Sequence, residues 1–203
     1  MYLSRLVLPL TELVAQRLLA DPHALHSALM QAMPTPCGRV LFRIEPPDRR
    51  APDMAVVLVQ SETQPRWDTN PVARGARADS RQFDPSFIAG QRLRFRLRAN
   101  PTVKKKEAGK ENGKRQGLIT EEAQQAWLKR KGEQGGFRIE GCVVVDEKML
   151  EGQKAMGERL AFRSVRYEGI LVVTNPDLFK HTLAAGIGSG KAFGFGLLSV
   201  ARA

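Results

Sequence analysis

Apolar and polar residues alternate along several short stretches of this chain, and elsewhere they recur at helical spacing. From Arg92 to Ala99 the alternation is strict, with arginines on one side and apolar residues on the other. This period of two predicts a strand with one buried face. Runs rich in Val, Leu, Ile and Phe predict further strands over residues 1–10, 38–46, 53–61, 137–147, 161–175 and 196–203, and a weaker strand is expected near 78–83.

Three helices are predicted from their apolar spacing and their end residues. Residues 21–34 begin with an Asp cap and a Pro at the first helical position, and apolar residues then recur three and four positions apart. Residues 120–136 begin at a Thr and end at a glycine pair, and residues 175–186 run from an Asn-Pro pair to a Gly. The charged segment 102–117 is expected to be a flexible loop.

The order of these elements predicts the fold class. From Gln91 onward the chain reads strand, helix, strand, strand, helix, strand, and the first half follows a similar but less clear order. This order predicts an α+β protein of tandem ferredoxin-like (RRM-like) domains, each with an antiparallel sheet and helices on one side. We expect the first domain over residues 1–88 and the second over residues 89–203.

The charge of the chain indicates its class of partner. Lys and Arg number 32 against 21 acids, the formal net charge is +11 and the sequence pI is about 10.2. Such a balance favours a polyanion: nucleic acid is the usual candidate, although an anionic membrane surface or a ribosomal location gives a similar composition. No run approaches the ~18 apolar residues of a membrane helix, and the two cysteines form no CxxC pattern, so we expect a cytoplasmic protein.

The basic residues concentrate in one stretch. Between Arg92 and Arg115 there are ten basic residues and two acidic ones. Four arginines on one strand face, with no acids between them, repel one another and favour a phosphate partner over a solvated face. The predicted RNA-binding residues are Arg92, Arg94, Arg96, Arg98, Lys104, Lys105, Lys106 and Lys191.

A glycine-rich segment near the C-terminus, "GIGSGKAFGFGLL", raises the alternative of nucleotide binding. A Walker A loop needs a further Gly five residues before its Gly-Lys pair and a Ser or Thr after the Lys, but Ala185 and Ala192 occupy these positions. The segment also joins a helix to a strand, which is the reverse order, and no G-x-G-x-x-G register fits. We therefore expect its glycines to allow a close backbone approach to RNA or to the other domain; they are Gly186, Gly188, Gly190, Gly194 and Gly196.

The segment has internal symmetry, with a Gly-apolar-Gly triplet at each end and five residues between them. It resembles the glycine-rich element of repeat-associated RNA-processing proteins of CRISPR systems. The whole chain resembles the CasE-type endoribonucleases of type I-E systems, which cut precursor CRISPR RNA. The similar features, in the family's order, are "MYLSRLVL", the helix with His26, "QRLRFRLRANP", "AWLKRK", "YEG" and the glycine-rich segment itself.

This resemblance implies a metal-independent cleavage in which a ribose 2'-hydroxyl attacks its own phosphodiester and leaves a 2',3'-cyclic phosphate. It also implies that His26 acts in the reaction. An imidazole suits this role because its pKa of about 6.5 lets it exchange protons near neutrality. On the helix, His26 is expected at the edge of the buried face and His23 farther toward solvent. We expect no metal or other cofactor, because His23 and His26 lack an obvious third zinc ligand.

Two positions depart from the family pattern. Some members carry a tyrosine where this chain has His23, and some carry a lysine where it has Gln31. The hypothesis is that His23 and His26 share the acid and base roles, with the transition-state cation supplied by Lys191 or an arginine of the second domain. The implied partners are the repeat stem-loop of precursor CRISPR RNA and the other subunits of the type I-E surveillance complex. The alternative is a non-catalytic RNA-binding module of the same superfamily.

Overall fold

The alternating segments become the strands of two antiparallel sheets. In the computed structural model, which describes residues 1–70, 72, 75–105, 114–153 and 159–203, the first sheet has the order β2-β3-β1-β4. Its strands are β1 (Tyr2–Pro9), β2 (Val40–Ile44), β3 (Met54–Ser61) and β4 (Arg77–Gln82). The predicted hairpin of β2 and β3 is confirmed, with Val40 opposite Ser61.

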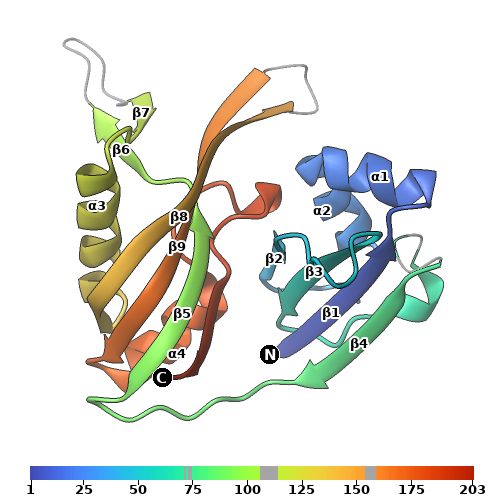
Figure 1. Cartoon of the computed structure of the whole chain (residues 1–203). Coiled ribbons are helices and arrows are strands. Elements are labelled where there is room, and N and C mark those ends of the chain that lie inside the picture. The colour runs from blue at the N-terminus through green and yellow to red at the C-terminus, as the bar shows by residue number, and fades with distance from the viewer. Residues whose placement is uncertain (71, 73–74, 106–113, 154–158) are drawn as a thin grey trace.

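The second sheet repeats the same arrangement, with the order β10-β5-β9-β8. Its strands are β5 (Arg92–Ala99), β8 (Phe137–Gln153), β9 (Arg159–Val173) and β10 (Leu198–Arg202). Numbered within its own half, each sheet places its first strand between the third and the fourth, which is the ferredoxin-like order. The predicted tandem α+β fold is therefore confirmed. The boundary that we propose after residue 88 lies in the connection between β4 and β5, which joins the two sheets in Figure 1.

Helices cover one face of each sheet. The helices are α1 (Leu13–Ala20), α2 (Pro22–Met30), α3 (Glu121–Gln134) and α4 (Pro176–Ala185). Leu25 and Leu29 of α2 are fully buried against β1, β2 and β3, while Trp127 of α3 and Phe179 of α4 pack on β5 and β9. Two separate cores result, and each burial of a large apolar side chain contributes roughly 1.5 to 3 kcal/mol.

Three segments differ from the sequence predictions. Helix α1, which precedes α2, was not predicted, because it lacks a side-chain cap and buries only Ala15. The expected flexible loop begins and ends as an antiparallel ladder, formed by β6 (Thr102–Lys105) and β7 (Lys114–Gly117). The second helix of the first half is replaced, within the described residues, by the 3-10 helix η1 (Trp67–Thr69).

Strand β5 shows why the arginine alternation was a reliable signal. Leu93, Phe95 and Leu97 are buried in the second core, whereas the arginines lie on the opposite face.

In Figure 1 the second sheet stands beside the first one, and the long β8–β9 hairpin extends past both. None of the helices in the described part of the chain has the length and apolar run that a membrane crossing requires.

Candidate active site at the junction of the two sheets

Helix α2 carries both candidate histidines in its first two turns. Asp21 caps this helix, since its Oδ1 accepts hydrogen bonds from the backbone N–H groups of His23 (2.9 Å) and Ala24 (3.2 Å). Pro22 takes the first helical position, where no N–H is needed. The sequence therefore fixes where the helix begins, and with it the directions in which His23 and His26 project.

His26 is half buried, as its place on the helix predicted. Its ring stacks on Phe42 of β2 with centroids 6.0 Å apart, and its buried Nδ1 has no hydrogen-bond partner among the described residues. Burial lowers the pKa of His26 below the usual 6.5, and the charge of His23 lowers it further. A neutral imidazole at neutral pH, anchored on one side and open on the other, is suited to accept a proton.

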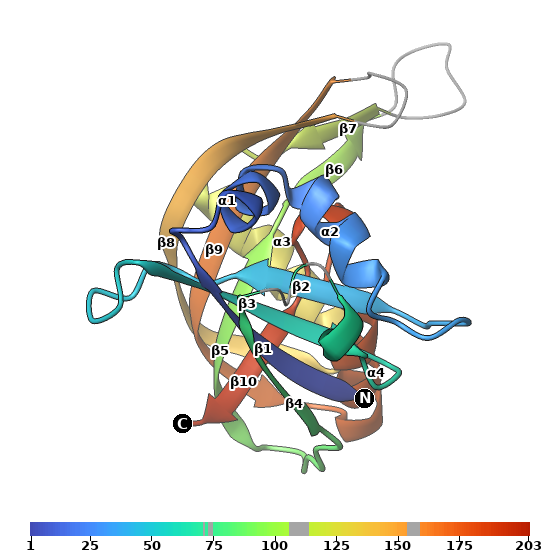
Figure 2. The same cartoon turned by 90° about the vertical axis from the view of Figure 1, so that its right-hand side faces the viewer.

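His23 was expected to point toward solvent, and this prediction is wrong. The side chain is half buried because Phe193 lies over it, with ring centroids 5.6 Å apart. Phe193 belongs to the 3-10 helix η3 (Lys191–Phe193) in the middle of the glycine-rich segment. The segment in the second half of the chain therefore contacts the histidine-bearing helix of the first half, as Figure 2 shows where α2 overlies it.

The glycine-rich segment runs from α4 to β10, the helix-to-strand order that excluded a phosphate-binding loop. Two of its glycines lie against β2: a Cβ on Gly186 would stand 2.7 Å from Leu41, and one on Gly194 would stand 3.1 Å from Phe42. Both have positive φ angles, of 75° and 80°. From the sequence, these glycines could approach either RNA or the other domain. The structure shows them close to β2 of the first half, against the Phe42 ring on which His26 stacks.

Next to this segment lies a cleft of about 610 Å3 that is lined by basic residues. Its five cations come from four regions of the chain, and no carboxylate of the described residues lines it: Arg39, Lys104, Arg115, Lys131 and Lys191. We call this the basic cleft. Lys191 is half buried and donates a hydrogen bond to the Ala185 carbonyl (2.7 Å), and burial, followed by the charge of Arg39, lowers its pKa.

The basic cleft contains two of the predicted RNA-binding lysines, Lys104 and Lys191. Lys105 is the last residue of β6, and Lys106 lies outside the described residues. Arg115 ends the basic stretch that the sequence analysis singled out, although it was not among the named RNA-binding residues, whereas Arg39 and Lys131 were not predicted because only the fold brings them to this cleft. Lys131 stands in the last turn of α3, where a cation is common at a helix end, so its sequence context did not indicate RNA binding.

The arginine row of β5 corrects a premise of the sequence analysis. The row was expected to be free of acids, but carboxylates reach it from other strands. Arg92 pairs with Glu140 of β8 (2.7 Å), and Arg96 pairs with Glu45 (2.7 Å) and with Glu168 of β9 (2.8 Å). Arg98 donates to the Ser164 hydroxyl (2.8 Å). Carboxylates thus pair with Arg92 and Arg96, while Arg94 is exposed on the strand, so that part of the repulsion within the row is relieved inside the protein.

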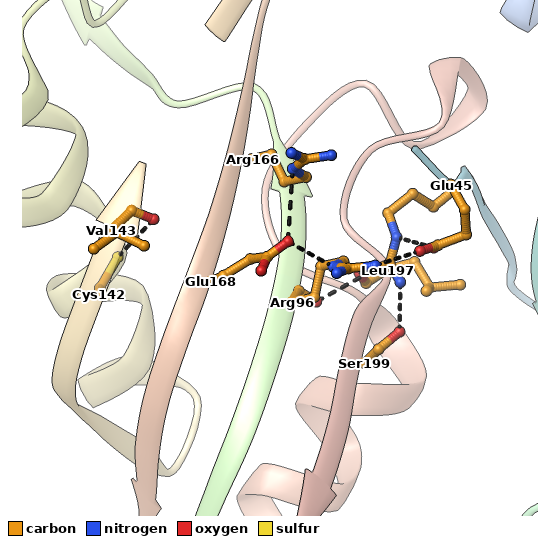
Figure 3. A network of polar contacts seen from close by, with 9 residues as sticks. Glu45, Arg96, Cys142, Val143, Arg166, Glu168, Leu197 and Ser199 are labelled. Atoms are coloured by element: carbon orange, nitrogen blue, oxygen red, sulfur yellow. Dashed lines mark hydrogen bonds and ion pairs between the residues drawn. The ribbon is translucent and has the colours of Figure 1, made fainter. Parts of the chain in front are cut away.

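Glu45 belongs to a network that joins the two sheets, drawn in Figure 3. Arg43 of β2 is 2% exposed, and its guanidinium bonds Glu45 (2.6 Å), the Leu197 carbonyl (3.0 Å) and the Ser199 hydroxyl (2.9 Å). Burial lowers the pKa of Arg43, while the adjacent Glu45 raises it. We call these contacts the arginine latch. It fixes β2 against β10, and therefore α2 against the glycine-rich segment.

No group of three or more His, Cys, Asp or Glu side chains able to hold a metal ion occurs within the described ranges. Both cysteines are free thiols, and burial raises the pKa of Cys142 to about 11.

The fold and the site together define a tandem ferredoxin-like protein with two histidines at the junction of its halves. A family model described as CRISPR associated protein matches residues 1–202. The CRISPR-associated endoribonuclease Cse3 of Thermus thermophilus is 39% identical, and the alignment covers 99% of this chain and all of Cse3. The chain therefore belongs to the CRISPR-associated protein family.

Other relatives agree with this assignment. The CRISPR system Cascade subunit CasE of Escherichia coli is 30% identical, with 99% of each chain covered. A structure of Cse3 bound to a 19-nucleotide RNA matches with a TM-score of 0.87 at 37% identity over the full length of both chains. The crystal structure of Cas6e from Escherichia coli matches with a TM-score of 0.75 at 30% identity, again over both full chains.

Proposed function

We propose that this protein is a metal-independent endoribonuclease that cuts the repeat stem-loop of precursor CRISPR RNA. The observation that carries the proposal is the half-buried His26, whose pKa is lowered and whose ring lies beside His23 on one helix. The basic cleft, which Lys191 lines two residues before Phe193, offers a surface for the RNA backbone.

The reaction that suits these groups needs only proton transfer. The 2'-hydroxyl loses its proton to one imidazole and its oxygen bonds to the adjacent phosphorus; the bond from phosphorus to the 5'-oxygen breaks, and that oxygen receives a proton from the other imidazole. His26, which burial keeps neutral, is suited to be the base, and His23 is the candidate acid. The products are a 2',3'-cyclic phosphate and a 5'-hydroxyl, and Lys191 has N–H groups left to face the developing charge.

The relatives support the choice of substrate and partners. One is named an endoribonuclease, one a Cascade subunit, and Cse3 has been solved with an RNA that represents a pre-cleavage complex. We propose that this chain likewise binds the repeat hairpin, retains the cleaved product and joins the other subunits of a type I-E surveillance complex in the cytoplasm. Double-stranded RNA is read mainly through its backbone and groove shape, which suits a cleft lined by cations.

One assay tests the proposed function against its alternative, a non-catalytic RNA-binding module. Purified protein should cut a transcript of its own CRISPR repeat once, in buffer with excess EDTA. Product ends should resist a phosphatase that cannot open cyclic phosphates and should accept a 5'-phosphate from a kinase. Binding without cleavage would favour the non-catalytic module, and cleavage abolished by EDTA but restored by a divalent cation would overturn the metal-independent mechanism.

The basic cleft makes a prediction of its own. Replacing Lys131 or Arg115 with Gln should weaken binding of the repeat RNA, because each change removes a cation from a surface that no described carboxylate lines. The slope of log affinity against log salt should become shallower by about 0.7 to 0.9 for each phosphate that the protein no longer neutralises. Binding is measured by fluorescence anisotropy at several salt concentrations. Lys180→Gln, on α4 and paired with Asp84, is the matched control, and an equal slope for all variants would remove the cleft from the RNA surface.

A further inference from the structure

The β2–β3 hairpin opens beside the basic cleft. The last pair of its ladder joins Val40 to Ser61, and the next two residues in register are Arg39 and Glu62. Here a side chain takes over from the ladder, because Glu62 Oε1 accepts a hydrogen bond from the backbone N–H of Arg39 (2.8 Å). A carboxylate is a strong acceptor for such an amide. The bond fixes the backbone at the point where the chain enters β2.

Gly38 leaves the space that this carboxylate occupies. A Cβ at this position would overlap the carboxylate group of Glu62. The backbone angle does not itself demand a glycine, because Gly38 is not among the glycines with positive φ. What the missing side chain supplies is therefore room for Glu62 beside Arg39.

The end of β3 is also tied to α4. Gln60, two residues before Glu62, is buried and donates from Nε2 to two carbonyls in the last turn of α4, those of Leu183 (2.9 Å) and Ala184 (3.4 Å). Lys191 of the basic cleft donates to the next carbonyl of the same turn. Carbonyls at a helix end lack partners within the helix and accept such bonds. One helix end thus holds both the strand that leads to Glu62 and the lysine of the cleft.

Arg39 lines the basic cleft together with Lys191. Glu62 bonds the backbone of Arg39, and the guanidinium forms no ion pair or hydrogen bond with any residue that the structure describes. Burial, and after it the charge of Arg39, lowers the pKa of Lys191, so the two cations are close enough to interact. A phosphate between them would be attracted by both, and a guanidinium presents several N–H donors to it.

We propose that Glu62 is a positioning residue for RNA binding: it fixes the backbone of Arg39, so that the Arg39 guanidinium and Lys191 together bind one phosphate of the RNA. This role rests on the proposed function and adds to it an acid that helps to bind a polyanion. By its charge alone Glu62 would repel RNA. Its effect through Arg39 has the opposite sign, and the two effects can be separated by substitution.

The first test measures affinity for repeat RNA that carries a 2'-deoxy sugar at the cleaved nucleotide. In anisotropy titrations Arg39→Gln should weaken binding about tenfold, as expected when one charged hydrogen bond is removed. Glu62→Ala should weaken binding about threefold or more, although it removes a negative charge. Glu62→Gln removes the same charge but keeps an oxygen that can accept the Arg39 N–H, so it should bind at least as tightly as the wild type.

Gly38→Ala offers an independent route to the same change. Its methyl group would displace the Glu62 carboxylate, so the variant should lose as much affinity as Glu62→Ala, and the double variant should lose no more than either single one. At saturating protein the single-turnover cleavage rate of Glu62→Ala on all-ribose RNA should equal that of the wild type, because only binding is affected. Glu12→Ala removes an exposed acid without a side-chain cap bond and should bind like the wild type.

Three outcomes would overturn the positioning role. They are unchanged or tighter binding by Glu62→Ala, a loss in Glu62→Gln as large as in Glu62→Ala, and additive losses in the double variant with Gly38→Ala. The proposed function is judged separately, by wild-type cleavage of the all-ribose repeat. A wild-type protein that cuts this RNA while Glu62→Ala binds as tightly as the wild type would overturn the role of Glu62 alone.

Discussion

Replacing His26 with alanine is expected to lower the single-turnover rate of repeat-RNA cleavage by about 10²- to 10⁴-fold, the usual contribution of a positioned proton-transfer group. Affinity for uncleaved RNA should be little changed, because the cations that hold the backbone line the basic cleft. The measurement is a single-turnover time course with protein in excess over labelled transcript. His181→Ala, on the exposed face of α4, is the matched control, and full activity in His26→Ala would remove His26 from the mechanism.

The pH dependence of the same rate tests the assignment of the base. Burial and His23 both lower the pKa of His26, so its neutral form prevails at neutral pH and is lost only in acid. The limb of the profile that reports the base should therefore rise with pH through this lowered pKa, with its midpoint below about 6.5. In His23→Ala one of the two causes is removed, and the rising limb should move toward higher pH. An unchanged rate and profile in His23→Ala would show that His23 takes no part.

Removal of Arg43 is expected to cause the largest loss of stability among single substitutions at the junction. Arg43→Ala leaves the Leu197 carbonyl, the Ser199 hydroxyl and one oxygen of Glu45 without their partner in a buried region. Breaking a buried pair on one side costs about 3 to 5 kcal/mol, and Arg96, which still pairs with Glu45, places the expected value near the lower end. Arg77→Ala removes an exposed pair and should change the free energy of unfolding by less than about 0.5 kcal/mol.

The two tryptophans allow this loss to be located. Trp67 is 6% exposed in the first core, and Trp127 is 3% exposed in the second. Urea unfolding followed through each one, in Trp67→Phe and Trp127→Phe backgrounds, should give coincident transitions for the parent protein. With Arg43→Ala added, the two transitions should separate, because the latch joins the two cores. Coincident transitions at an unchanged midpoint would show that the latch contributes little.

The elements that were predictable carried their signal locally. Strand β5 was evident from its alternation, and the starts of α2, α3 and α4 from the caps Asp21, Thr120 and Asn175, each of which accepts a backbone hydrogen bond in the structure. Helix α1 escaped prediction because it has no side-chain cap and fully buries only Ala15. The β6–β7 ladder escaped because a run of charges is typical of an irregular loop.

The site was only partly predictable, because its contacts join residues that lie far apart in the sequence. His26 and the glycine-rich segment could be found from the sequence, but their contact through Phe193 and Phe42 depends on how two separate cores dock. The acids that neutralise Arg96 in the arginine row lie 51 residues before it and 72 residues after it. No local pattern indicates such partners, so only the structure shows that Arg96 belongs to an ion network between the two sheets, while Arg92 and Arg94 remain exposed.

The docking of the glycine-rich segment beneath Phe42 has a consequence for how this molecule is organised. Each ferredoxin-like unit has its own sheet, helices and core, yet the histidines come from one unit while the ring that covers His23 comes from the other. Neither unit by itself possesses the arrangement around His23 and His26. Two units of one simple fold thus form a single composite arrangement at the seam between them, and the contacts across that seam set how the two imidazoles are placed.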